Sequence, residues 1–122
     1  MEGVYVSKAF SRSARREGVT DEHLKEAVDR AEKGTVDADL GGGLIKQRVA
    51  RPNRGRSGGF RTIIAYRRGT RAIFLHMFAK SKQANISGTE LAVLQEFAAE
   101  LEKLSDADLD RLVEEEGWRR IE

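Results

Sequence analysis

The sequence contains no cysteine, and this absence excludes disulfide bridges, thiolate zinc sites and cysteine nucleophiles. A chain without cysteine also suits a reducing compartment. Its stability must therefore come from packing. The 39% of residues that are hydrophobic are enough for the core of one domain spanning residues 1–122.

Long apolar runs and a secretory leader are missing as well. No run approaches the roughly 20 apolar residues that span a bilayer. The first residues, Met1–Ser7, lack the basic-then-apolar order of a signal peptide. We therefore expect a cytoplasmic protein with no membrane partner.

Acidic residues are missing from the middle of the chain. Residues 41–82 contain no Asp or Glu, whereas the flanking segments 1–40 and 83–122 hold all 20 acidic residues. Ordinary surfaces mix both signs, so this block predicts a polyanionic partner, although charges on exposed strands can also be simply solvated. The basic residues of the block are Lys46, Arg48, Arg51, Arg54, Arg56, Arg61, Arg67, Arg68, Arg71, Lys80 and Lys82.

Carboxylates and histidines are scarce where a nuclease would need them. Magnesium and manganese require oxygen ligands, so we expect no metal cofactor unless acidic side chains reach in from the flanks. The two histidines of the sequence, His23 and His76, make a paired-histidine mechanism unattractive. His76 remains open to two interpretations, a histidine at the edge of the core or an acid–base group.

RNA offers a reaction that needs no metal, because its 2′-hydroxyl can attack the neighbouring phosphate. Arginine can hold the phosphate in a bidentate manner, and a lysine among other cations can transfer protons. Lys46 and Arg48 project together from one predicted strand, and Arg61 and Lys80 are expected to join them across the sheet. Each of these residues can equally be a charge that only positions phosphate. Three aromatic residues among the charges are available to stack on bases or to pack in the core: Phe60, Tyr66 and Phe78.

Hydrophobic periodicity predicts an α+β fold in which helices cover one face of a small antiparallel sheet. The sheet would combine an N-terminal strand with a three-strand meander. Strict alternation puts His76 on one strand face with Phe74, Phe78 and Lys80. The expected elements are a strand at Val4–Val6, helices at Ala9–Arg16 and Thr20–Gly34 forming a hairpin, strands at Leu44–Val49, Phe60–Tyr66 and Ala72–Ala79, an exposed mobile loop at Ala50–Gly59, and helices opened by capping boxes at Ser87–Glu90 and Ser105–Asp108.

Residues 105–122 read as an acidic helical extension at the C-terminus. The four basic and eleven acidic residues of segment 83–122 suggest that these helices lie near the basic sheet and control access to it.

Three motifs together resemble the RelE/HigB group of toxins from type II toxin–antitoxin systems. They are Gly42-Gly43-Leu44-Ile45-Lys46-Gln47-Arg48, Gly58-Gly59-Phe60-Arg61 and Ala79-Lys80-Ser81-Lys82. The resemblance runs from the N-terminal strand to the helix at Ser87, and is closest to the branch with an extended basic loop before the Gly-Phe-Arg strand.

The resemblance implies a RelE-like α+β fold, cleavage of mRNA in the ribosomal A site, and neutralisation by a cognate antitoxin. It implies catalytic roles for Lys46, Arg48, Arg61, Lys80 and Lys82. We add as RNA-binding candidates Arg51, Arg54, Arg56, Tyr66, Arg67, His76 and Phe78. Where the best-known members have a base-stacking tyrosine, this chain has Ile86 and Ser87.

Two alternatives come from other functional classes. A ParE-like protein shares the fold and inhibits DNA gyrase without catalysis, but it lacks the basic set that Lys46, Arg48 and Arg61 retain here. The other alternative is a non-catalytic RNA-binding module, in which replacing Lys46 and Arg61 would weaken binding and change no cleavage.

Overall fold

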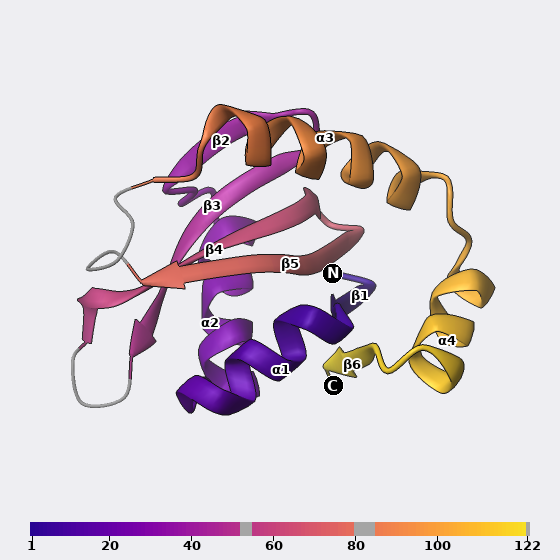
Figure 1. Ribbon diagram of the computed structural model, residues 1–122, viewed down its shortest axis with the longest axis horizontal. Coiled ribbons are helices and arrows are strands. Elements are labelled where there is room, and N and C mark those ends of the chain that lie inside the picture. Colours follow the sequence, from indigo (N-terminus) through magenta and orange to yellow (C-terminus); the bar gives the residue numbers. More distant parts are fainter. Residues whose placement is uncertain (52–54, 80–84, 122) are drawn as a thin grey trace.

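The computed structural model describes residues 1–51, 55–79 and 85–121, and the side chains of residues 1–50, 59–79 and 85–121. Figure 1 shows the arrangement of the chain. The elements are β1 (Gly3–Val6), α1 (Lys8–Glu17), α2 (Asp21–Glu32), β2 (Ala38–Gly41), β3 (Leu44–Arg51), β4 (Gly55–Arg67), β5 (Arg71–Ala79), α3 (Gly88–Glu102), α4 (Asp106–Glu115) and β6 (Arg119–Ile121).

The predicted α+β class is confirmed, but the sheet is larger than the sequence indicated and is mixed. It has six strands in the order β2-β3-β4-β5-β1-β6. The β3–β4–β5 meander is antiparallel as expected. The expectation of an entirely antiparallel sheet is wrong, because β1 runs parallel to β5. Alternation within a strand does not encode the direction of a neighbour that no short turn connects.

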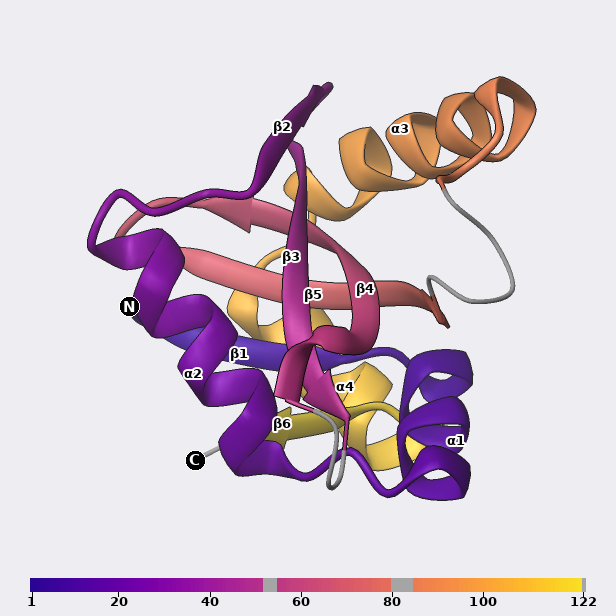
Figure 2. The same cartoon turned by 90° about the vertical axis from the view of Figure 1, so that its left-hand side faces the viewer.

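Helices cover both faces of the sheet, which corrects the expectation of one covered face. Figures 1 and 2 show α1 and α2 on one side and α3 on the other. One core contains Phe10, Leu24 and Phe74 beneath α1 and α2. The second contains Leu44 and Leu101 beneath α3 and α4. Burial on both faces explains why β5 has a nearly continuous apolar sequence.

The predicted helix starts are confirmed at the level of individual hydrogen bonds. Thr20, Ser87 and Ser105 are the N-caps of α2, α3 and α4, and each forms a reciprocal capping box with the third residue of its helix. The C-cap of α1 is Gly18, whose φ of 72° lies in the left-handed region that favours glycine.

Two segments differ from the prediction. The backbone of Ala50–Gly59 was expected to be a loop, yet β3 continues to Arg51 and β4 begins at Gly55. The glycines and arginines of this segment lack the apolar alternation that indicates a strand. The backbones of Arg51 and Gly55 nevertheless pair with each other.

The C-terminus was expected to be helical throughout, but α4 ends at Glu115 and β6 pairs antiparallel with β1. Arg119 secures this strand by donating to Ser11 and to both carboxylate oxygens of Asp21. Within the described residues, no helix has the length and apolar character needed to cross a bilayer.

Candidate functional site

Three of the predicted cationic residues lie side by side on one face of the sheet. In the β3–β4 register, Arg48 is opposite Arg61, and Lys46 is opposite Ile63. Ile63 belongs to the core beneath α3, so alternation along β3 and β4 puts the three cations on the α3 side. They share this face, as the nuclease hypothesis requires.

We define the cationic cluster as Lys46, Arg48 and Arg61, and Arg61 is its member on β4. Its side chain is half-buried, and its Nη1 atom is covered by protein without a hydrogen-bond partner among the residues that the structure describes. An unsatisfied buried donor costs free energy, and it costs more when the group is charged. A phosphate would satisfy this donor, because guanidinium groups bind phosphate oxygens in a bidentate geometry.

Arg48 is restrained by a carboxylate that enters from the segment before β2. Asp37 lies 3.5 Å from the Arg48 guanidinium and accepts the Arg48 backbone N–H at 2.7 Å. Arg30 of α2 lies 3.5 Å from the same carboxylate and also donates to the Arg48 carbonyl oxygen. Burial alone would raise the pKa of Asp37, but the Arg48 backbone hydrogen bond and the two guanidinium charges outweigh it and lower that pKa. Asp37 thus stays ionised and holds Arg48 beside the start of β2.

The N-terminal end of α3 borders the cluster. Lys46 Nζ donates to Asn85 Oδ1 at 3.3 Å, just before the helix. His76 Nε2 lies 3.9 Å from a carboxylate oxygen of Glu90, in the first turn of α3. The start of this helix therefore contacts both the lysine of β3 and the histidine of β5.

His76 lies on the α3 side of the sheet because β5 contains a bulge. Ile63 pairs with His76 and Ile64 with Phe74, so Leu75 is an extra residue in β5. The expectation that His76 shares a face with Phe74 is wrong, since Phe74 packs against Phe10 in the opposite core. Strict alternation fails here because a bulge shifts the side-chain order by one residue.

The aromatic candidates do not gather around the cations as exposed stacking surfaces. Phe78 lies next to His76, with ring centroids 6.0 Å apart, but it is only 7% exposed and belongs to the α3 core. Phe60 is buried in the opposite core. Tyr66 packs against that opposite core and donates its hydroxyl to Glu32. Burial, and then the hydrogen bond and charge of Glu32, raise the pKa of Tyr66, so the hydroxyl remains a donor.

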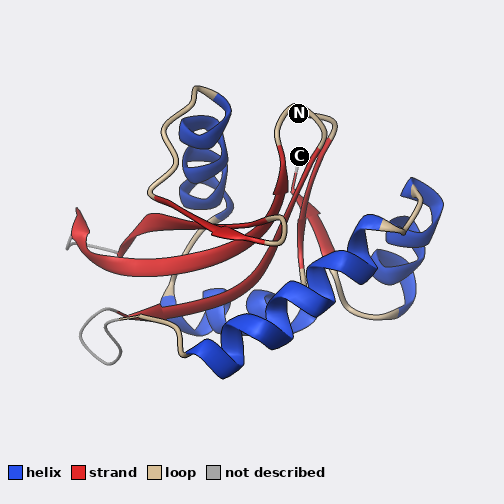
Figure 3. Cartoon of the chain, turned by 90° about the horizontal axis from the view of Figure 1, so that it is seen from above, coloured by secondary structure: helices blue, strands red, loops and turns tan. Residues whose placement is uncertain are grey.

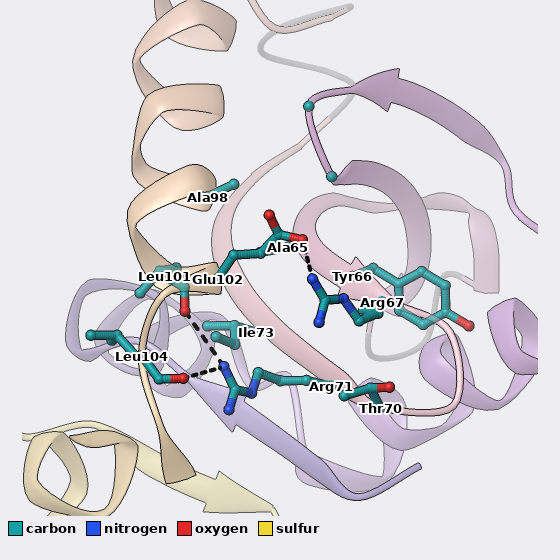
Figure 4. A pocket seen from close by; sticks show the side chains of 12 residues that line it. Ala65, Tyr66, Arg67, Thr70, Arg71, Ile73, Ala98, Leu101, Glu102 and Leu104 are labelled. Atoms are coloured by element: carbon teal, nitrogen blue, oxygen red, sulfur yellow. Dashed lines mark hydrogen bonds and ion pairs between the residues drawn. The ribbon is translucent and has the colours of Figure 1, made fainter. Parts of the chain in front are cut away.

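Arg67 lies near the C-terminal end of α3, away from the cluster. It lines a cavity of about 170 Å³ between the β4–β5 turn and α3 and forms an ion pair with Glu102 at 2.6 Å. Figure 4 shows the two side chains pointing towards each other. Arg71 lines the same cavity and donates to the carbonyl oxygens of Leu101 and Leu104. These hydrogen bonds tie the end of α3 to β5, so we interpret the cavity as part of the packing of α3.

Five candidates cannot be compared with the site, since their side chains lie outside the described residues. They are Arg51, Arg54, Arg56, Lys80 and Lys82. Across the described part of the chain, no three His, Asp or Glu side chains are grouped as metal ligands would be.

The acidic C-terminal segment does not lie over the cluster. Figures 1 and 3 show α3 running beside the sheet towards α4, so α4 follows the opposite end of α3 from Asn85 and Glu90. The idea that residues 105–121 control access to the cations receives no support from this arrangement.

Sequence reasoning missed three residues beside the site: Asp37, Asn85 and Glu90. The capping box located Glu90 at the start of α3, but it did not predict the approach to His76. Asp37 and Asn85 follow no motif, and their positions depend on how β2 and α3 pack against the meander.

The chain matches the model of a protein family. The model described as "RelE toxin of RelE / RelB toxin-antitoxin system" matches residues 2–121. No curated protein matched the chain.

Proposed function

Because this chain belongs to the RelE family of toxins from toxin–antitoxin systems, we propose that it arrests translation by cutting messenger RNA on the ribosome. A cognate antitoxin would neutralise it. One observation carries the proposal: Arg61 has a buried donor without a partner among the described residues and shares one sheet face with two further cations, Arg48 directly opposite it and Lys46 diagonal to it.

The chemistry follows from the residues of the cluster. The 2′-hydroxyl oxygen of the RNA attacks the adjacent phosphorus, the bond from phosphorus to the 5′-oxygen breaks, and a 2′,3′-cyclic phosphate and a 5′-hydroxyl result. Arg61 binds the phosphate and stabilises the negative charge of the transition state, assisted by Arg48. Lys46 adds positive charge, and its ammonium group can protonate the leaving oxygen.

The guanidinium of Arg48 forms an ion pair with Asp37. To bind the RNA phosphate, Arg48 must exchange this carboxylate for the phosphate. The pair is partly exposed, with 47% of the Arg48 side chain accessible, so exchange of the carboxylate for a phosphate carries a modest free-energy difference. Asp37 would then hold Arg48 in place until RNA binds.

Inducible expression in a bacterial host tests the proposal, with primer extension on a translated message as the readout. The wild type should arrest growth and cut the message, and Arg61→Ala should reduce cleavage about 100-fold or more, as expected for loss of one group that stabilises transition-state charge. The matched control is Arg111→Ala, which removes an exposed arginine of α4 and should cut like the wild type. Growth arrest without any cut in the message would contradict the proposal and favour a target such as gyrase.

A further inference from the structure

The bulge in β5 turns His76 towards the cationic cluster. Without the bulge, this histidine would face the core beneath α1 and α2. Without the extra residue Leu75, alternation from Phe74 would put His76 on the side of Phe10. With it, His76 lies in register with Ile63, whose neighbour on the other side is Lys46. Bulges interrupt strand pairing and often redirect a side chain at an active site.

The imidazole has two sides with different surroundings. Nε2 is covered and has no hydrogen-bond partner among the described residues, with Glu90 Oε2 at 3.9 Å. The side chain as a whole is 35% exposed, so the accessible part of the ring lies away from Nε2. A carboxylate beside one ring nitrogen favours the proton on that nitrogen, which leaves Nδ1 with a free lone pair.

Among the residues that the structure describes, the charged groups around this ring come from three elements. Lys46 belongs to β3 and Arg61 to β4, and both lie on the same sheet face as His76; Glu90 belongs to α3. A phosphate bound by the arginine would bring the neighbouring ribose close to the imidazole, because the two side chains are diagonal neighbours on adjacent strands, two positions apart along the ladder and on the same face.

We propose that His76 is the general base of the reaction, and that Glu90 is a positioning residue acting through it. This inference rests on the proposed RNA cleavage. Nδ1 of His76 accepts the proton of the 2′-hydroxyl while the bond from the 2′-oxygen to phosphorus forms. The bond to the 5′-oxygen breaks, and that oxygen takes a proton from the ammonium group of Lys46. Proton transfer from Lys46 to the leaving group and from the hydroxyl to His76 leaves the total charge unchanged.

Single-turnover cleavage of a defined message on translating ribosomes, measured across the neutral pH range, tests this role. The wild-type rate should rise with pH along a limb set by one ionisation. His76→Gln should lower the rate about 100-fold and abolish that limb. Glu90→Gln should keep the helix cap, because glutamine also closes a capping box, while lowering the rate through loss of the carboxylate beside the imidazole.

The chain offers a matched control for each variant. His23→Gln changes the other histidine, which caps α2, and glutamine can take over that cap. Asp108→Asn removes the carboxylate at the equivalent position of α4. Both controls should retain the wild-type rate and the wild-type pH profile.

The outcomes separate the two proposals. Cleavage by His76→Gln at the wild-type rate, or a wild-type rate that does not depend on pH, overturns the role of His76 and leaves the nuclease assignment intact. Absence of cleavage by the wild type overturns the nuclease assignment and this inference together. If thermal melting shows that His76→Gln is unfolded, the rate of Glu90→Gln decides: cleavage at the wild-type rate rejects the inference.

Discussion

Two carboxylates, Asp37 beside the cationic cluster and Glu32 at the end of α2, have pKa values that affect the stability of the fold. The pKa of Asp37 is lowered, as described above. The pKa of Glu32 is also lowered, chiefly by the hydrogen bond from the Tyr66 hydroxyl and further by the Gly69 N–H, against the opposing effect of burial. Both residues therefore favour the folded state when they are ionised.

The pH dependence of stability follows from these shifts. A carboxyl whose pKa is lower in the folded state contributes its full stabilisation above its unfolded value, and this contribution is lost as pH falls through the folded value. We expect the melting temperature to fall steeply below about pH 4, where unfolded carboxylates begin to bind protons. Asp37→Asn should lower the free energy of unfolding by about 1–3 kcal/mol at neutral pH, because Asp37 accepts charge-assisted hydrogen bonds, and should flatten the acid limb.

Urea denaturation of Asp37→Asn between neutral pH and about pH 3 measures both effects. Asp110→Asn, at an exposed position of α4, serves as the control and should match the wild type. Equal urea midpoints for Asp37→Asn and the wild type at every pH would contradict this assignment.

At the scale of elements, the start of α3 is where helix stability and the site meet. Ser87 accepts the Glu90 N–H at 3.1 Å, and Ser105 accepts the Asp108 N–H at 3.1 Å in the same arrangement on α4. The two caps are thus equivalent locally, but only the one on α3 adjoins the cluster.

Removing these caps should therefore separate stability from activity. Ser87→Ala and Ser105→Ala should each lower the free energy of unfolding by about 1 kcal/mol. Ser87→Ala should also slow message cleavage, because fraying of the first turn displaces Glu90, whereas Ser105→Ala should not. Urea midpoints and single-turnover rates measure the two effects, and equal cleavage rates in the two variants would show that the first turn of α3 has no part in the reaction.

The sequence predicted those elements that are determined by residues close together in the chain. The capping boxes at Ser87 and Ser105 and the β4–β5 hairpin depend on residues close together in the chain. The bulge at Leu75 and the parallel pairing of β1 depend on how distant strands meet. Alternation carries no information about either, so the true face of His76 could not be read from the sequence.

At the scale of the whole molecule, the asymmetric charge distribution becomes a surface property. The segment without acidic residues supplies the three clustered cations, while Asp37 and Glu90 come from the acid-containing flanks to border them. Composition could therefore predict the cationic face of Lys46, Arg48 and Arg61, but not the two carboxylates, whose approach requires the packed helices.

Binding of RNA to this face should depend strongly on salt. Each phosphate of a single strand that a protein cation neutralises releases a counterion. It thereby contributes a slope of about −0.7 to the plot of log affinity against log salt concentration. Arg61→Ala should make that slope shallower by about 0.7, and Arg111→Ala should leave it unchanged. Fluorescence anisotropy of a labelled single-stranded RNA at increasing KCl measures the slope; identical slopes for wild type and Arg61→Ala would show that Arg61 contacts no phosphate.

The pairing of β6 with β1 has a consequence for synthesis of the protein. Strand β1 is made first, yet one of its two neighbours, β6, is made after every other described element. While the chain is being made, β1 therefore has an unpaired edge until residues 119–121 leave the ribosome. The sheet is therefore completed only after all of its other strands and all of the described helices have been synthesised.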